Sequence, residues 1–114
     1  EELIVRTTTG DIGILAGHVD CVAPLGMGRA TVIIDGQKRY AACIGGMVSV
    51  VNGQVTLVAT TFEWAEEIDV PRAQAAQQRA QAALDAGVQD PLEKAALKER
   101  LTRAEVRLRV AQER

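Results

Sequence analysis

Four arginines in the second half of the sequence are spaced so that they could bind a polyanion. Arg72 and Arg79 are seven residues apart. Arg103 and Arg107 are four residues apart, so in a helix each pair would lie on one face. Guanidinium groups bind phosphate through paired hydrogen bonds, and four of them without carboxylate partners would repel one another. The spacing predicts a polyphosphate site if the two segments pack together. A solvated basic face, with Asp69 acting only as a helix cap, is the alternative.

Residues for other kinds of chemistry are scarce. His18 is the only histidine, which leaves a metal site or a Ser-His-Asp triad poorly supplied. Cys21 and Cys43 lack CxxC spacing and lie among apolar residues, so we expect buried structural thiols. The glycines within 10–13 and 45–46 lack the strand-to-helix context of a phosphate loop and are interpreted as turn glycines. We therefore expect a non-catalytic protein whose sequence requires no metal.

The composition limits which residue types can form the core and indicates where in the cell the protein lies. Of the 114 residues, 47% are hydrophobic but only 3% are aromatic, so the core must consist of Val, Ile, Leu and Ala. No apolar run reaches the roughly 20 residues that a membrane-spanning helix needs, so we expect a cytosolic protein. The chain begins without Met inside the apolar run 3–5, which predicts that N-terminal strands are missing.

Charge is unevenly distributed along the chain. Residues 1–69 carry four basic and nine acidic side chains, whereas residues 92–114 carry seven basic and four acidic side chains. A basic helix could bind nucleic acid. However, acidic residues are interleaved in this segment and aromatic platforms for base stacking are absent, so we expect no nucleic-acid partner.

The first half of the chain has the pattern of an all-β unit. Up to about Thr61, short β-branched runs alternate with glycine turns at close spacing, which is typical of a sandwich. Asn52 and Gly53 lie between two such runs, as do Asp35 and Gly36. These pairs favour type I′ hairpin turns, because both central residues of that turn need a positive φ.

Two helices are predicted in the second half. Asp69 as N-cap and Pro71 in the first turn predict a helix over 70–85, and Asp90 predicts a second helix over 91–112. Each helix has a stripe of small or apolar side chains: Ala73, Ala76, Ala80, Ala83 and Leu84 in the first, and Leu97, Leu101, Ala104, Leu108 and Ala111 in the second.

The stripes predict an antiparallel helical hairpin, since the connecting loop is short. Alanine buries little area, at about 25 cal/mol per Å², so we expect the hairpin to be marginally stable and able to open. The predicted fold class is α+β: an N-terminal antiparallel β-sandwich over residues 1–66, followed by a C-terminal antiparallel α-helical hairpin over residues 67–114.

The order and spacing of three motifs resemble the epsilon subunit of bacterial F-type ATP synthases over almost the whole chain. G-D-I-G-I-L-A-G-H at 10–18 is similar to a glycine-rich stretch of that family, and G-G-M at 45–47 to one of its strands. I-D-V-P-R-A at 68–73 resembles its (I/L)-D-x-x-R-A motif. The sequence departs from the family at Ala16 and Asp20, where proline is frequent.

The resemblance implies a central-stalk (rotor) subunit of a synthase that couples proton transport to ATP synthesis. The sandwich would bind the gamma subunit and the c-ring, with Asp11 and His18 at the contact. The protein would lie at the cytoplasmic face of the cell membrane and touch the membrane only through the complex. The hairpin would be a regulatory arm that either folds against the sandwich or extends into the alpha/beta catalytic head. There the basic helix would meet an acidic surface and hinder ATP hydrolysis.

The resemblance also implies that the folded hairpin binds ATP as a regulatory ligand, not as a substrate. The positions that match the family's ATP site are Glu63, Ile68, Asp69, Arg72, Ala73, Arg79, Arg103 and Arg107. The alternative function is that of a free-standing nucleotide-sensing or adaptor protein with no synthase partner.

Overall fold

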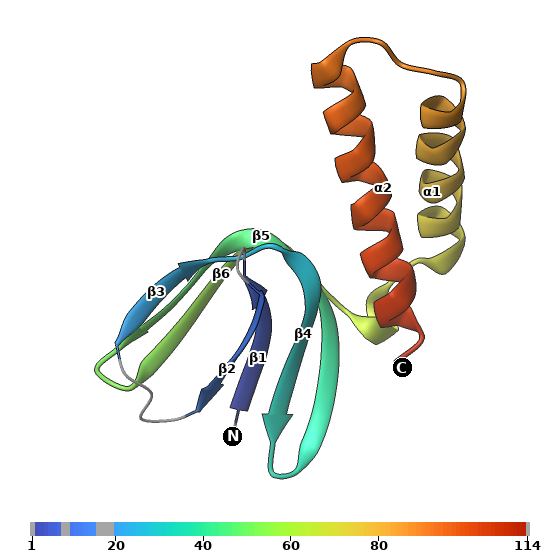
Figure 1. Cartoon of the computed structure of the whole chain (residues 1–114). Helices are drawn as coiled ribbons and strands as arrows, with labels where there is room; N and C mark the ends of the chain where they lie inside the picture. Colours follow the sequence, from blue (N-terminus) through green and yellow to red (C-terminus); the bar gives the residue numbers. More distant parts are fainter. Residues whose placement is uncertain (1, 8–9, 16–19, 114) are drawn as a thin grey trace.

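The computed structural model describes residues 2–7, 10–15 and 20–113, which form an antiparallel sheet followed by two helices (Figure 1). This arrangement confirms the predicted fold class. The strands are β1 (Glu2–Thr7), β2 (Gly10–Leu15), β3 (Cys21–Pro24), β4 (Met27–Ile34), β5 (Gln37–Val51) and β6 (Gln54–Trp64). A one-turn 3-10 helix, η1 (Ala65–Glu67), leads to α1 (Val70–Asp85) and α2 (Pro91–Ala111).

The long strand β5 connects the two halves of the sheet. The strand order is β2-β1-β4-β5-β3, and β6 pairs with β5 as well. The first half of β5 pairs with β4 and its second half with β3. Between these halves lie Gly45 and Gly46, with φ values of 68° and 108°. A Cβ on Gly46 would lie 1.9 Å from the carbonyl oxygen of Val58, so only glycine fits there.

Both predicted hairpin turns are confirmed. Ile34 is opposite Gln37 across the first turn, and Val51 is opposite Gln54 across the second. In the first turn Asp35 and Gly36 have φ values of 52° and 75°, and in the second the Asn and Gly at 52–53 have 51° and 77°. These positive values are those that a type I′ turn requires.

The sheet encloses an aliphatic core, as the composition predicted. The buried residues of this cluster come from four strands and the β3–β4 connection: Val5, Ile14, Leu25, Ala30, Ala41, Cys43, Val48 and Val50. Both cysteines are free thiols. Cys43 is buried as expected, but Cys21 is only partly buried, so the prediction of two buried thiols is wrong for Cys21. Cys21 is on the short strand β3, which pairs only with β5.

The two helices begin and end close to where the sequence predicted. The side chain of Asp69 accepts a hydrogen bond from the backbone N–H of Arg72 (3.1 Å), and that of Asp90 accepts one from Leu92 (3.0 Å). Gly87 follows α1 with a φ of 90°. The helices run antiparallel, side by side (Figure 1). Four alanines of the predicted stripes are buried: Ala73, Ala80, Ala104 and Ala111.

A second apolar face of α2 attaches the hairpin to the sheet. Val106, Val110 and Ala111 form a buried cluster with Ala42 of β5 and with Ala65 and Ile68, and we call these six residues the docking cluster. The single apolar stripe that the sequence predicts for α2 does not include Val106 and Val110. The C-terminal end of α2 lies at the sheet, and the loop between the helices points away from it (Figure 1). The molecule is therefore elongated, with extents of 50 × 29 × 17 Å. No described helix is both long and apolar enough to cross a bilayer.

Candidate functional site

A small pocket lies where β6, α1 and α2 meet. Its volume is about 190 Å³, and its lining comes from the end of β6, the first turns of α1 and the C-terminal half of α2. Six of the eight predicted ATP-site residues line it, together with Ala76. The lining residues are Glu63, Asp69, Arg72, Ala73, Ala76, Arg79 and Arg107.

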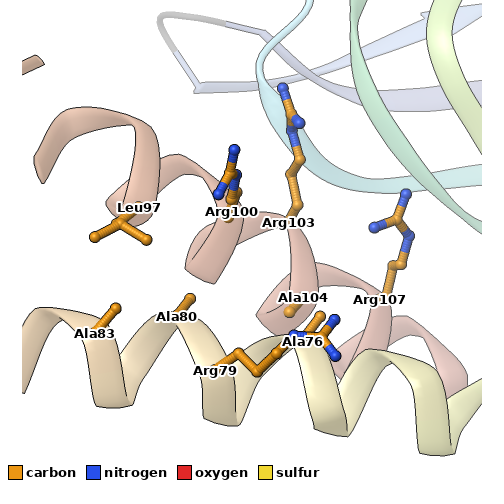
Figure 2. Close-up of a pocket in the computed structure, with 9 residues that line it drawn as sticks. All are labelled: Ala76, Arg79, Ala80, Ala83, Leu97, Arg100, Arg103, Ala104 and Arg107. Carbon is orange, nitrogen blue, oxygen red and sulfur yellow. The ribbon is translucent and has the colours of Figure 1, made fainter. Parts of the chain in front are cut away.

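The pocket continues into a larger groove between the two helices. The groove has a volume of about 520 Å³ and shares Ala76, Arg79 and Arg107 with the pocket. Arg103, the seventh predicted residue, lines this groove and not the pocket. Figure 2 shows the arginines of α2 extending from one side of that helix, with Arg79 on α1 across the groove. The lining residues are Ala76, Arg79, Ala80, Ala83, Leu97, Arg100, Arg103, Ala104 and Arg107.

Ile68, the eighth predicted residue, lines neither space. Its side chain is 4% exposed and belongs to the docking cluster. It precedes Asp69, whose side chain caps α1 and lines the pocket. Burial of Ile68 therefore fixes the start of α1 against the sheet and positions the Asp69 carboxylate at the pocket.

Two of the four arginines have carboxylate partners, contrary to the expectation of four unpaired cations. Arg107 Nε lies 2.6 Å from Glu63 Oε1, and both side chains are about one-third exposed, at 30% and 34%. Arg103 pairs with Glu99 one turn earlier on α2. The first pair is not apparent from the sequence because Glu63 and Arg107 are 44 residues apart. The second pair joins Arg103 to one of the acidic residues interleaved in the basic segment. Within the described residues, no carboxylate lies within 4.0 Å of Arg72 or Arg79.

Arg103 has a further polar atom that faces no acceptor. Its Nε is buried and makes no hydrogen bond within the part of the chain that the structure describes. A buried donor without an acceptor costs about 1–3 kcal/mol, more when the group is charged. The guanidinium groups that line the pocket and the groove can hold an anion by charge and hydrogen bonding, and the carboxylates at the pocket can accept hydrogen bonds from N–H groups.

Asp11 lies on the sheet and is far in sequence from the residues that line this pocket. It is on β2 and is exposed, and it forms an ion pair of 3.0 Å with Arg6 on β1. His18, the other residue predicted for the c-ring contact, lies outside the described residues. The structure consequently describes one of the two residues predicted for this contact.

The main residue that the sequence analysis missed is Arg100. It lies three residues before Arg103 and seven before Arg107, so all three are on one face of α2. That spacing was visible in the sequence, but the resemblance supplied only the later two. Leu97 and the groove alanines were assigned to helix packing, and they also form the floor of the groove.

Comparison with known proteins gives matches over both halves of the chain. Residues 1–65 match the beta-sandwich domain of the ATP synthase delta/epsilon chain, and residues 66–112 match the long alpha-helix domain of the same chain. An ATP synthase epsilon chain from Caldicellulosiruptor bescii is 39% identical over 113 residues, which cover 99% of this chain and 82% of that protein. The Bacillus subtilis ATP synthase epsilon chain is 46% identical over 90 residues, covering 79% of this chain and 68% of that protein.

A solved structure has a similar fold. It is a chain in the cryo-EM structure of the Euglena gracilis mitochondrial ATP synthase, described as OSCP/F1/c-ring in rotational state 1. The TM-score is 0.68 with 26% sequence identity, and the match covers 97% of this chain and 65% of that chain. The present chain thus spans about two thirds of the length of that structural relative.

Proposed function

Because the chain belongs to the ATP synthase delta/epsilon chain family, we propose that it is a non-catalytic central-stalk subunit that couples proton transport to ATP synthesis. Its bacterial relatives are named epsilon chains, and the similar solved chain belongs to an assembly that contains F1 and the c-ring. In this proposal the sheet binds the gamma subunit and the c-ring, with Asp11 and His18 at the contact. The protein lies on the cytoplasmic face of the membrane and touches it only through the complex.

The helical hairpin is the regulatory arm in this proposal. It is attached to the sheet by the six side chains of the docking cluster and by two ion pairs, Arg107 with Glu63 and Arg29 with Glu113 (2.9 Å). Three of the six cluster residues are alanines, so the apolar area that docking buries is small. Such a contact can open at modest cost. The released basic helix α2 would then bind an acidic surface of the alpha/beta catalytic head and hinder ATP hydrolysis.

The folded arm binds ATP as a regulatory ligand. One observation carries this step: residues from β6, α1 and α2 that are far apart in sequence line one pocket, and they include Glu63, Asp69, Arg72, Arg79 and Arg107. The pocket exists only while both helices are docked, because each element supplies part of its wall. ATP at one hundred times its dissociation constant would stabilise the docked arm by about 2.7 kcal/mol.

The experiment that tests the proposal is ATP hydrolysis by the reconstituted catalytic head with gamma, with and without this chain. At low ATP, where the arm is free to extend, the chain should slow hydrolysis. At high ATP, where the arm is held against the sheet, the inhibition should become smaller. An equal rate with and without the chain at every ATP concentration would overturn the regulatory role.

Co-purification with gamma separates this role from the alternative. A stable complex with gamma supports a stalk subunit. ATP binding by the chain without any gamma complex would instead favour a free-standing nucleotide sensor.

A further inference from the structure

The pocket and the groove that joins it differ in charge. The pocket has two carboxylates, those of Glu63 and Asp69, beside three arginines. The groove is lined by four arginines and, within the described residues, by no carboxylate. Since the two spaces share Arg79, Arg107 and Ala76, they adjoin each other, and one ligand could occupy both. The charge of this site becomes more positive from the pocket toward the groove.

Arg100 extends the cationic row of α2 beyond the positions that the family resemblance indicates. Its separation from Arg107 is seven residues, or about 10 Å along the helix axis. Arg100, Arg103 and Arg107 extend from the same side of α2 in Figure 2. Within the described residues, Arg100 has no carboxylate within 4.0 Å, so its guanidinium group is available to a ligand.

In the proposed ATP site, the charge gradient favours a nucleotide whose base lies at the pocket and whose phosphate chain runs into the groove. We propose that Arg100 binds the terminal phosphate of a nucleotide in this orientation. In this orientation the amino group of an adenine can donate to a carboxylate at the pocket. The opposite orientation would place phosphate oxygens next to the carboxylates of Glu63 and Asp69, and these negative charges would repel one another.

A phosphate group in the groove would lie beside the guanidinium group of Arg103, which lines it. The next phosphate along the chain then lies toward Arg100. The inference rests on the proposed ATP site and adds to it a residue that distinguishes a triphosphate from a diphosphate.

Titration calorimetry on the full chain tests this assignment with three ligands: ATP, ADP and inorganic tripolyphosphate. The variant is Arg100→Gln, and its matched control is Arg109→Gln, which removes an exposed arginine of the same helix that lines neither space. Arg100→Gln should weaken ATP binding by about three- to tenfold, as expected for one partly solvated charge-assisted contact, and should leave ADP binding nearly unchanged. Arg109→Gln should change neither. Circular dichroism confirms that both variants are folded.

The outcomes separate this inference from the function on which it rests. If the native chain binds ATP but Arg100→Gln weakens ATP and ADP equally, or neither, Arg100 does not bind the terminal phosphate, although the ATP site stands. If the native chain binds no nucleotide, the proposed ATP site is wrong and the nucleotide orientation with it. In that case, if the native chain binds tripolyphosphate and Arg100→Gln weakens this binding, the groove is still supported as a phosphate site. If the native chain does not bind tripolyphosphate, the groove is not a phosphate site.

Discussion

At the scale of single residues, the Arg107–Glu63 pair has two roles. It joins α2 to β6 and it lies in the wall of the candidate ATP pocket. The family resemblance implied that both residues belong to one site, but the sequence does not show that they form an ion pair, because this pairing depends on how α2 docks. Glu99, by contrast, pairs with Arg103 within a single helix.

The docking role predicts a measurable coupling between Arg107 and Glu63. A double-mutant cycle of Arg107→Gln and Glu63→Gln, followed by urea denaturation, should give about 1 kcal/mol, because the pair is only one-third exposed and joins two parts of the fold. The same cycle for Arg103 and Glu99 serves as the control and should give about 0.3–0.5 kcal/mol, as is usual for exposed pairs one turn apart. Equal couplings would mean that the Arg107–Glu63 pair is not specific to docking.

Ionisation of the Cys43 thiol should make the free energy of unfolding depend on pH in the alkaline range. Burial raises the pKa of this thiol above its ordinary value. A neutral thiol therefore favours the folded state. This contribution is fully present below the pKa of the thiol in the unfolded chain and is lost as the pH rises through the raised pKa of the folded state.

Urea titrations in the alkaline range check this. The midpoint should fall more steeply with rising pH for the native chain than for Cys43→Ala, once the lower baseline of the variant is subtracted. Cys21→Ala is the matched control, since Cys21 is partly exposed. Parallel pH profiles for the native chain and Cys43→Ala would show that the Cys43 thiol does not cause the loss of stability at alkaline pH.

At the scale of elements, the sequence predicted the helices well because their ends are determined locally. Asp69 and Asp90 both cap a helix with their own side chains, and proline follows each cap closely. The hairpin turns were predictable for the same reason. Docking was harder to predict, since Val106 and Val110 belong to a second face whose apolar character extends over only the last turns of α2.

The two caps allow the ligand role of Asp69 to be separated from its structural role. Asp69→Ala and Asp90→Ala each remove an N-cap, at a cost of about 1 kcal/mol to the helix. Only Asp69 also lines the pocket. Asp69→Ala should therefore weaken ATP binding in calorimetry clearly more than Asp90→Ala does. Equal losses would indicate that capping alone explains the effect and that the Asp69 carboxylate does not contact the nucleotide.

At the scale of the whole molecule, the fold contains two apolar clusters of different size. One lies within the sheet, and the docking cluster joins the sheet to the hairpin. Val110 is 1% exposed and belongs only to the second cluster. Loss of its methyl groups should therefore affect the arm without opening the sheet.

Val110→Ala removes two buried methyl groups, which should destabilise docking by about 1.5–3 kcal/mol. Hydrogen exchange followed by mass spectrometry should show faster exchange in α1 and α2 and unchanged exchange in β4 and β5. Leu92→Ala is the control, because Leu92 is 82% exposed at the far end of α2 and should alter neither region. ATP should restore part of the lost protection, since it binds only the docked arm. A regulatory arm requires that docking of the hairpin and folding of the sheet be separate equilibria. If Val110→Ala speeds exchange in the sheet as much as in the helices, the molecule opens as one unit. The arm could then not switch independently of the sheet.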